Sequence, residues 1–352
     1  MFSQMNQKKI VVAVTGLNAI DSPGPGVAVI RAIRDEFKDN VRIIGLSYET
    51  LEPGIYMHDI VDKTYQIPYP TAGTQSLLSR LKYIHNIEKI NVVIPNFDAE
   101  LYNFIKIESA LRDLGIQSFL PSLEQLESRD KINLSAFGKK HNLLVPDEKV
   151  IYSVNDLPSC EEDLNFPLVI KGKFYDAIIA HTLEQAQKAF YKLSAKWGLP
   201  IIVQQFLTGT EINIAVLGDG NGNATSIVPM RKLYITDKGK AWAGITLEDE
   251  NLLAIAKSFT NSTNWKGGCE LEIMRTVDNK LYIMEINPRF PAWIYLTAGA
   301  GQNQPASLVK MAMGEKLIPF ENYTIGKLFI RYAWDLITDV QEFQKISALG
   351  EL

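Results

Sequence analysis

The sequence predicts an α/β fold, in which a doubly wound parallel sheet at the N-terminus is followed by an α+β region built largely from hairpins. Over the first ~120 residues, short β-branched runs alternate with helical stretches, which is typical of a parallel sheet with crossover helices. Further along, strand-like segments follow one another across glycine-rich turns, which is typical of antiparallel pairing. The chain has 352 residues, and we expect two or three packed subdomains at this length.

The N-terminal segments have the pattern of strands buried on both faces. Residues 9–15 form a continuous apolar run of this kind. A turn rich in glycine and proline, residues 16–26, follows it and leads into a helical segment. The remaining predicted elements of this part are strands at residues 41–46 and 92–95 and helices at residues 75–86 and 100–114.

The middle of the chain has a different pattern. Residues 121–150 are predicted to form short helices, with Ser122 and Ser128 as N-caps. A compact unit then follows, with a strand at residues 168–171, a helix at 183–197 and a strand at 201–206. The later predicted elements are hairpins over 211–235 with a turn at 218–222, a helix at 248–259, strands at 268–275 and 280–287 joined at Asp278-Asn279, and helices at 292–298 and 305–313.

Composition limits the classes of function. Hydrophobic residues make up 46% and charged residues 22%, as in globular proteins. No apolar run reaches the ~18 residues that span a bilayer, and the polar N-terminus lacks a secretory signal pattern. Cys160 and Cys269 are too few for a disulfide framework or a zinc cluster. These features together favour a cytoplasmic protein with no membrane partner. With a net charge of −4 and no basic run, we expect no nucleic-acid partner.

The strongest chemical signal is the segment 285–289, Glu-Ile-Asn-Pro-Arg. Because alternate residues of a strand share a face, Glu285 and Asn287 project together, with Arg289 just beyond. Glu272, on the preceding predicted strand, can lie opposite Glu285. Two carboxylates and an amide oxygen suit Mg²⁺ together with substrate phosphates, and Arg289 suits phosphate oxygens. The alternative is that Asn-Pro only ends a strand and leaves both glutamates in solvent.

Two further signals involve lysines and a strand edge. Lys131 lies at a predicted helix start, and Lys171 ends an apolar strand, where an unpaired buried ammonium would be costly. The alternative for either lysine is a side chain that snorkels to water. Residues 204–211, Gln-Gln-Phe-Leu-Thr-Gly-Thr-Glu, offer free backbone groups to an adenine edge and a carboxylate to a ribose. Taken alone, an ordinary strand, a glycine turn and an exposed glutamate are the simpler interpretation.

The order of these motifs resembles the ATP-grasp superfamily, and within it the branch of the carbamoyl-phosphate synthase large chain. Residues 93–100, Val-Ile-Pro-Asn-Phe-Asp-Ala-Glu, resemble a loop of that branch in which a strand is followed by Pro-x-x-Asp-x-Glu. The resemblance implies a pre-ATP-grasp domain over residues 1–120 and a two-lobed α+β ATP-grasp domain. The lobes would be a small or lid subdomain over residues 121–206 and a metal- and substrate-binding subdomain over residues 207–352.

The resemblance also implies cofactors and roles. ATP and Mg²⁺ would be bound, with two metal ions and Mn²⁺ as an alternative metal. The implied nucleotide-binding residues are Lys131, Lys171, Gln204, Gln205, Phe206, Leu207 and Glu211. The implied metal ligands are Glu272, Glu285 and Asn287. The implied catalytic residues are Arg289, Arg231 and Lys173. Arg231 follows a strand, at a place where the family often has a base that contacts phosphate or substrate.

The implied activity is that of a carboxylate–amine or carboxylate–thiol ligase, which forms an acyl phosphate and releases ADP and phosphate. Its substrates would be small-molecule or peptide carboxylates and amines, and homodimers occur among such relatives. Residues 172–177 depart from the family pattern, because one glycine is followed by bulky residues where a glycine-rich loop is usual. Two alternatives therefore stay open, namely a catalytically weakened ATP-binding regulatory protein and an enzyme that releases the acyl phosphate.

Trp293 and Tyr295 also depart from the branch, which usually has small residues there. They are candidates for lining the pocket of a bulky or peptide-like acceptor. The alternative is that both rings belong to the core beneath a C-terminal helix.

Overall fold

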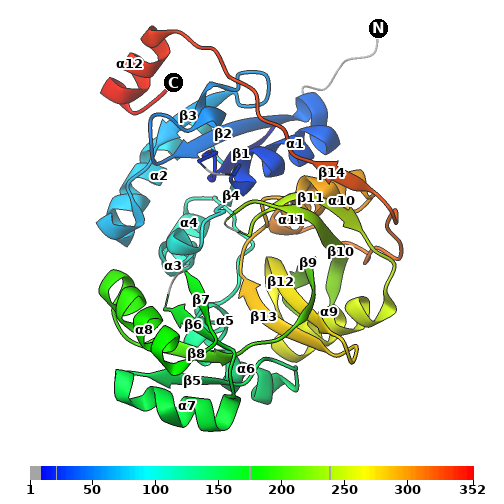
Figure 1. Cartoon of the computed structure of the whole chain (residues 1–352). Helices are drawn as coiled ribbons and strands as arrows, with labels where there is room; N and C mark the ends of the chain where they lie inside the picture. The colour runs from blue at the N-terminus through cyan, green and yellow to red at the C-terminus, as the bar shows by residue number, and fades with distance from the viewer. Residues whose placement is uncertain (1–8, 21, 174–175, 238) are drawn as a thin grey trace, which may run out of the picture. The chain divides into compact units, whose positions relative to one another are not determined.

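The computed structural model describes residues 9–20, 22–173, 176–237 and 239–352. Its first sheet has the strand order β3-β2-β1-β4, with every neighbouring pair parallel (Figure 1). The strands are β1 (Ile10–Val14), β2 (Val41–Ser47), β3 (Lys63–Gln66) and β4 (Val92–Ile94). Most residues of β1, β2 and β4 are buried, which explains their unbroken apolar runs. The predicted parallel sheet is confirmed, and β3 is an addition that its polar sequence did not predict.

The helices of this region begin and end at recognisable signals. Helix α1 (Pro25–Phe37) starts with proline in its first turn and ends at Lys38, where φ is +49°. Helix α2 (Thr74–Glu88) ends at Lys89 in the left-handed conformation. The single helix predicted over residues 100–114 is instead two helices, α3 (Asp98–Lys106) and α4 (Glu108–Asp113), because the backbone leaves the helical conformation at Ile107.

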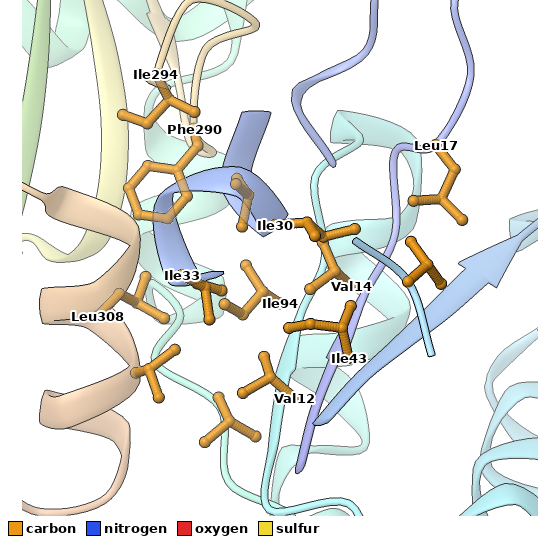
Figure 2. Close-up of a cluster of buried hydrophobic side chains, with 14 of the residues drawn as sticks. Val12, Val14, Leu17, Ile30, Ile33, Ile43, Ile94, Phe290, Ile294 and Leu308 are labelled. Atoms are coloured by element: carbon orange, nitrogen blue, oxygen red, sulfur yellow. The ribbon is translucent and has the colours of Figure 1, made fainter. Parts of the chain in front are cut away.

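The first of two compact units contains the residues up to Leu123, with Ile214–Glu270 and Asn287–Leu352. Its core joins segments that are distant in sequence, as Figure 2 shows. Val12 and Ile43 of the parallel sheet and Ile33 of α1 pack in one cluster with Phe290 and Leu308. The C-terminal contributions come from the segment around α10 (Tyr295–Gly299) and from α11 (Gln304–Ala312).

The second unit contains Glu124–Asn213 and Leu271–Ile286. Its sheet has the order β5-β8-β6-β7, and all three pairs are antiparallel. The strands are β5 (Glu148–Ile151), β6 (Leu168–Gly172), β7 (Ala177–Ala180) and β8 (Ile201–Gln205). Helices α7 (Leu157–Leu164) and α8 (Leu183–Trp197) share a buried apolar cluster with one face of this sheet. The three-part division predicted from the sequence stays a prediction, since the compact units combine separated segments.

A six-stranded sheet has the order β13-β12-β9-β10-β11-β14. The predicted pair of long strands is present as β12 and β13, and Asn279 takes a positive φ of 63° at the turn between them. The bounds are β9 (Gly209–Asp219), β10 (Ala224–Ile235), β11 (Ala241–Thr246), β12 (Lys266–Thr276), β13 (Leu281–Asn287) and β14 (Leu328–Ile330).

Residues 121–150 differ most from the prediction. Ser128 is the last residue of α5 (Leu123–Ser128) and not an N-cap, since its hydroxyl donates back to the carbonyl of Gln125. Helix α6 (Leu134–His141) follows Asn133, and the segment then becomes strand β5. The other helices are α9 (Glu250–Thr263) and α12 (Val340–Leu349). Every helix in the described part of the chain is too short or too polar to cross a lipid bilayer.

Candidate functional site

One face of the β5-β8-β6-β7 sheet is polar. The antiparallel register places Glu148 opposite Gln204, and Gln204 opposite Val169. Lys171 pairs with Ile202, two residues before Gln204, so it lies on the same face. The other face carries the apolar residues that pack with α7 and α8. The second unit therefore presents a carboxylate, an amide and an ammonium group side by side.

Lys171 is the centre of the charges on this face. Burial lowers the pKa of Lys171, because desolvation disfavours the charged ammonium. The carboxylate of Glu285 acts most strongly in the opposite direction, and Lys131 adds to the lowering. Glu148 and Glu272 also raise the pKa of Lys171. Both predicted acidic metal ligands of this unit thus act on the same ammonium group.

Lys131 joins the same cluster. It begins a short 3₁₀ helix, Lys131–Asn133, so the predicted helix start is present in this form. Its Nζ lies 3.3 Å from Oε2 of Glu285, and the two side chains are 25% and 29% exposed. Because each partner keeps contact with solvent, the ion pair adds little stability and can exchange for another ligand.

In the side chain of Gln204, the amide nitrogen has a hydrogen-bond partner and the amide oxygen has none. Its Nε2 donates to Oε2 of Glu148 at 3.1 Å, whereas its Oε1 has no hydrogen-bond partner although the residue is only 1% exposed. A buried polar atom without a partner costs about 1–3 kcal/mol. The arrangement therefore favours a ligand that brings a donor to this oxygen. The predicted residues that follow, Gln205, Phe206 and Leu207, are half-buried, and Glu211 of β9 is exposed.

Asn287 lies in the first unit and is held by a carboxylate, Glu270, that the sequence motifs did not indicate. Its Nδ2 donates to Oε2 of Glu270 at 3.2 Å, and Oε1 of Glu270 accepts from Nε1 of Trp293 at 2.6 Å. Glu270 is only 6% exposed. The sequence signal for it was present, since Glu270 lies two residues before Glu272 and so on the same face of β12.

Arg289 is also fixed within the first unit. Its Nε donates to Oδ2 of Asp98 at 2.9 Å, and Nη1 donates to the carbonyl of Phe290 at 3.3 Å. Its Nη2 lies 3.5 Å from Oδ1 of Asn287. Asp98 is the first residue of α3 and belongs to the loop that resembles the carbamoyl-phosphate synthase branch. The guanidinium is thus oriented by three neighbours from two segments.

The other two predicted catalytic residues, Arg231 and Lys173, are both exposed. Arg231 is exposed on β10, where it pairs with Ile245 of β11. Lys173 is exposed directly before residues 174–175, which lie outside the described residues, so the predicted loop 172–177 is seen only in part. Their catalytic roles stay predictions.

Trp293 and Tyr295 belong to the packing of the first unit. Trp293 is 5% exposed and lies in the hydrophobic cluster, with its ring nitrogen bound to Glu270. The hydroxyl of Tyr295 donates to Asp35 at 2.6 Å, and the guanidinium of Arg31 lies 4.2 Å from the centre of its ring. Their contacts support the structural alternative rather than an acceptor pocket.

The described residues contain no metal site made only of the usual titratable ligands. Among residues 9–20, 22–173, 176–237 and 239–352, no group of three or more His, Cys, Asp or Glu side chains could hold a metal ion. The predicted set differs in composition, since it combines the carboxylates of Glu272 and Glu285 with the amide oxygen of Asn287. In the described part of the chain, Cys160 and Cys269 are buried and not in disulfides.

Sequence comparisons identify relatives of the chain. Residues 199–328 match the family described as ATP-grasp in the biosynthetic pathway with Ter operon. The carbamoyl phosphate synthase large chain of Clostridium perfringens (strain 13 / Type A) is 22% identical over 344 residues, which cover 89% of this chain and 30% of that protein. The D-alanine–D-alanine ligase of Bordetella pertussis is 30% identical over 118 residues, covering 32% of this chain and 37% of the ligase. The chain thus matches about a third of the length of these relatives.

A solved structure shows the same fold. It is the biotin carboxylase domain of 2-oxoglutarate carboxylase from Hydrogenobacter thermophilus, in complex with MgADP, ADP and bicarbonate. The TM-score is 0.69 at 16% identity, over 90% of this chain and 74% of that one. The family match spans Gln204, Glu272, Glu285, Asn287 and Arg289. The resemblance to the ATP-grasp superfamily is thus confirmed by the family match over residues 199–328, by the two sequence relatives and by the shared fold.

Proposed function

We propose that this protein is an ATP- and Mg²⁺-dependent ligase that activates a carboxylate as an acyl phosphate and transfers the acyl group to an amine or a thiol. The observation that carries the proposal is the cluster in the second unit, where Glu285 pairs with Lys131 and acts on Lys171. Gln204 and Glu148 lie on the same sheet face as Lys171. Cations, carboxylates and an unpartnered acceptor together suit a nucleotide with its metal.

The residues present fit a nucleotide. Two ammonium groups, from Lys131 and Lys171, suit phosphate oxygens, and burial of Lys171 makes an anionic ligand more favourable there. The unpartnered Oε1 of Gln204 is an acceptor for a base amino group. We assign phosphate contacts to the two lysines, the base-binding segment to residues 204–207 and the ribose contact to Glu211.

The residues present also fit Mg²⁺, which prefers oxygen ligands and keeps substrate phosphates in its coordination shell. Glu272 and Glu285 would supply carboxylates and Asn287 an amide oxygen, with the Asn287 nitrogen already engaged by Glu270. Bound Mg²⁺ would supply neutralisation of the phosphate charge. The Lys131–Glu285 pair would then separate, so that the lysine meets phosphate and the glutamate meets metal.

The chemical step needs positioning and charge neutralisation more than covalent work by side chains. A carboxylate oxygen attacks the terminal phosphorus of ATP, and the bond to ADP breaks. The nucleophile then attacks the acyl carbon, and phosphate leaves. Arg289, already oriented by Asp98 and Phe290, would stabilise the phosphoryl group without reorganising. Arg231 and Lys173 are assigned supporting contacts to phosphate or substrate.

The test follows ADP, phosphate, AMP and pyrophosphate after incubation with ATP, Mg²⁺ and pooled acids and amines. ADP and phosphate formation that depends on both pools supports the ligase. AMP and pyrophosphate would contradict it, because they indicate adenylation. Nucleotide binding without any turnover would favour the regulatory alternative, and ADP formation with the acid pool alone would favour release of the acyl phosphate.

The Glu285→Ala variant checks the site itself. We expect it to abolish turnover by loss of the metal contact. The control is Glu184→Ala, which removes a carboxylate of α8 that is 76% exposed and should leave turnover unchanged. Full activity in Glu285→Ala would show that the site has been placed wrongly.

A further inference from the structure

We infer that Glu148 sets the nucleobase preference of the proposed site, by holding the Gln204 amide so that its oxygen accepts from an exocyclic amino group. The inference rests on the proposed function, since it takes the sheet face of Gln204 as the base-binding face. Glu148 is then a positioning residue that acts through Gln204. The chemical class selected is a purine nucleotide with an amino group at position 6, in preference to one with a carbonyl group there.

The first step concerns the orientation of the amide. The two ends of a glutamine amide are chemically opposite, so its neighbours decide which end faces where. Oε1 of Glu148 accepts from the backbone N–H of Ser135 at 3.0 Å, and Oε2 accepts from Nε2 of Gln204 at 3.1 Å. An ionised carboxylate only accepts hydrogen bonds. Rotation of the amide would place two acceptor oxygens against each other, so Glu148 fixes the nitrogen on its own side.

The second step concerns the amide oxygen of Gln204. Oε1 of Gln204 has no partner in a residue that is 1% exposed. A donor that reached this oxygen would remove the cost of leaving it unpaired. An amino group of the ligand would donate to this oxygen, whereas a carbonyl group would face it acceptor to acceptor. Sites with a fixed, buried polar group discriminate strongly against ligands that leave that group unpaired.

The third step concerns the support of Glu148 itself. Glu148 and Gln204 are direct cross-strand partners on β5 and β8, so their contact is set by the sheet register. Ser135 lies in the first turn of α6 and holds the second oxygen of Glu148. Burial raises the pKa of Glu148, and the Ser135 N–H, the Gln204 amide and the charge of Lys171 act in the opposite direction, in favour of the carboxylate. Hydrogen bonds from β8 and α6 thus keep the carboxylate in place to orient the amide.

The experiment measures binding of fluorescent ADP and GDP derivatives to the full chain with Mg²⁺, without turnover. The wild type should prefer ADP by on the order of tenfold or more. Glu148→Gln replaces the acceptor with an amide that can also donate, so the Gln204 amide can rotate. We expect the ratio of ADP to GDP affinity to fall by about tenfold, with weaker ADP and stronger GDP binding. A structural loss alone would weaken both nucleotides alike and leave the ratio unchanged.

A second variant covers the case in which Glu148→Gln does not fold, as judged by thermal melting. Gln204→Leu removes the acceptor and keeps Glu148, and it should also lower the ADP to GDP ratio. Glu184→Gln is the matched control and should keep the wild-type ratio, because Glu184 lies on α8 with a largely exposed side chain.

The outcomes separate the inference from the proposed function. If the wild type binds neither nucleotide, both are overturned. If it prefers ADP but a folded Glu148→Gln variant, or Gln204→Leu in its place, keeps that preference, only the role of Glu148 and Gln204 is overturned. A wild type that binds ADP and GDP equally well also overturns the inference, while nucleotide binding by the proposed site stands.

Discussion

At the scale of single residues, the molecule keeps several carboxylates out of water and gives each of them hydrogen-bond donors. Glu100 is 1% exposed and accepts from the hydroxyls of Thr15 and Tyr48 and from the backbone N–H groups of Asn96 and Phe97. Burial nevertheless dominates over these donors and raises the pKa of Glu100 to about 7. A buried carboxyl group of this kind makes stability depend on pH.

The direction in which stability changes with pH follows from the raised pKa of Glu100. The folded state binds the proton of Glu100 more tightly than the unfolded state, whose carboxyl has the ordinary value of 4.5. The stabilisation is therefore complete below pH 4.5 and is lost as the pH rises through about 7. By linkage it amounts to roughly 3 kcal/mol. Urea unfolding of the wild type at pH 5 and pH 8 should show this loss, and Glu100→Gln should reduce it. An equal loss in both proteins would rule out Glu100 as the source.

Arg289 gives the second prediction at this scale. Lysine lacks the planar guanidinium group with its several N–H donors. Arg289→Lys therefore cannot contact Asp98, Asn287 and phosphate at the same time. We expect kcat/KM for the ligase reaction to fall on the order of a hundredfold, with an unchanged melting temperature. Arg112→Lys on α4, where the side chain is exposed, should have no effect. Wild-type kinetics in Arg289→Lys would mean that Arg289 is a structural residue of the Asp98 loop.

The sequence predicted the residue types of the site better than their neighbours. Lys171 and Glu285 were readable, because strand alternation and the end of an apolar run are local signals. Glu148 was hidden in a segment predicted to be helical, since only pairing with β8 makes it a strand. Asp98 and Glu270 act through partners that are far away in sequence. Such partners depend on register and topology, which a local pattern does not contain.

At the scale of elements, predictions succeeded where start and stop signals were strong. Helix α8 has the predicted bounds, because Thr182 caps its start and Gly198, with a φ of 76°, ends it. Strands β7, β11 and β14 were missed, because each is short and is completed by its sheet neighbours.

The α8 cap provides the prediction at this scale. The hydroxyl of Thr182 accepts from the backbone N–H of Gln185 at 3.3 Å. Thr182→Ala leaves that donor without its partner and should cost about 1 kcal/mol of unfolding free energy. Thr182→Ser keeps the acceptor and should recover most of the loss, as measured by urea unfolding. A serine variant as unstable as the alanine variant would assign the effect to the lost methyl group instead.

At the scale of the whole molecule, each of the two compact units has a hydrophobic cluster among its described residues. One includes Ile30 and Ile33 of α1 in the first unit, and the other includes Leu193 of α8 in the second unit. Lys171, Gln204 and Glu285 all belong to the second unit, whereas Asn287 and Arg289 belong to the first. The proposed nucleotide contacts therefore depend mainly on the stability of the second unit.

This division predicts two unfolding transitions in calorimetry, because each unit has its own core. Leu193→Ala should lower the temperature of one transition, and Ile33→Ala should lower that of the other. Each substitution leaves a buried cavity and should cost roughly 2–5 kcal/mol of unfolding free energy. MgADP should raise the transition that Leu193→Ala lowers, since ligand binding stabilises the unit that supplies most of the contacts. A single transition that both variants lower equally would show that the two cores unfold as one cooperative unit. A shift by MgADP of only the Ile33-sensitive transition would move the proposed nucleotide contacts to the first unit.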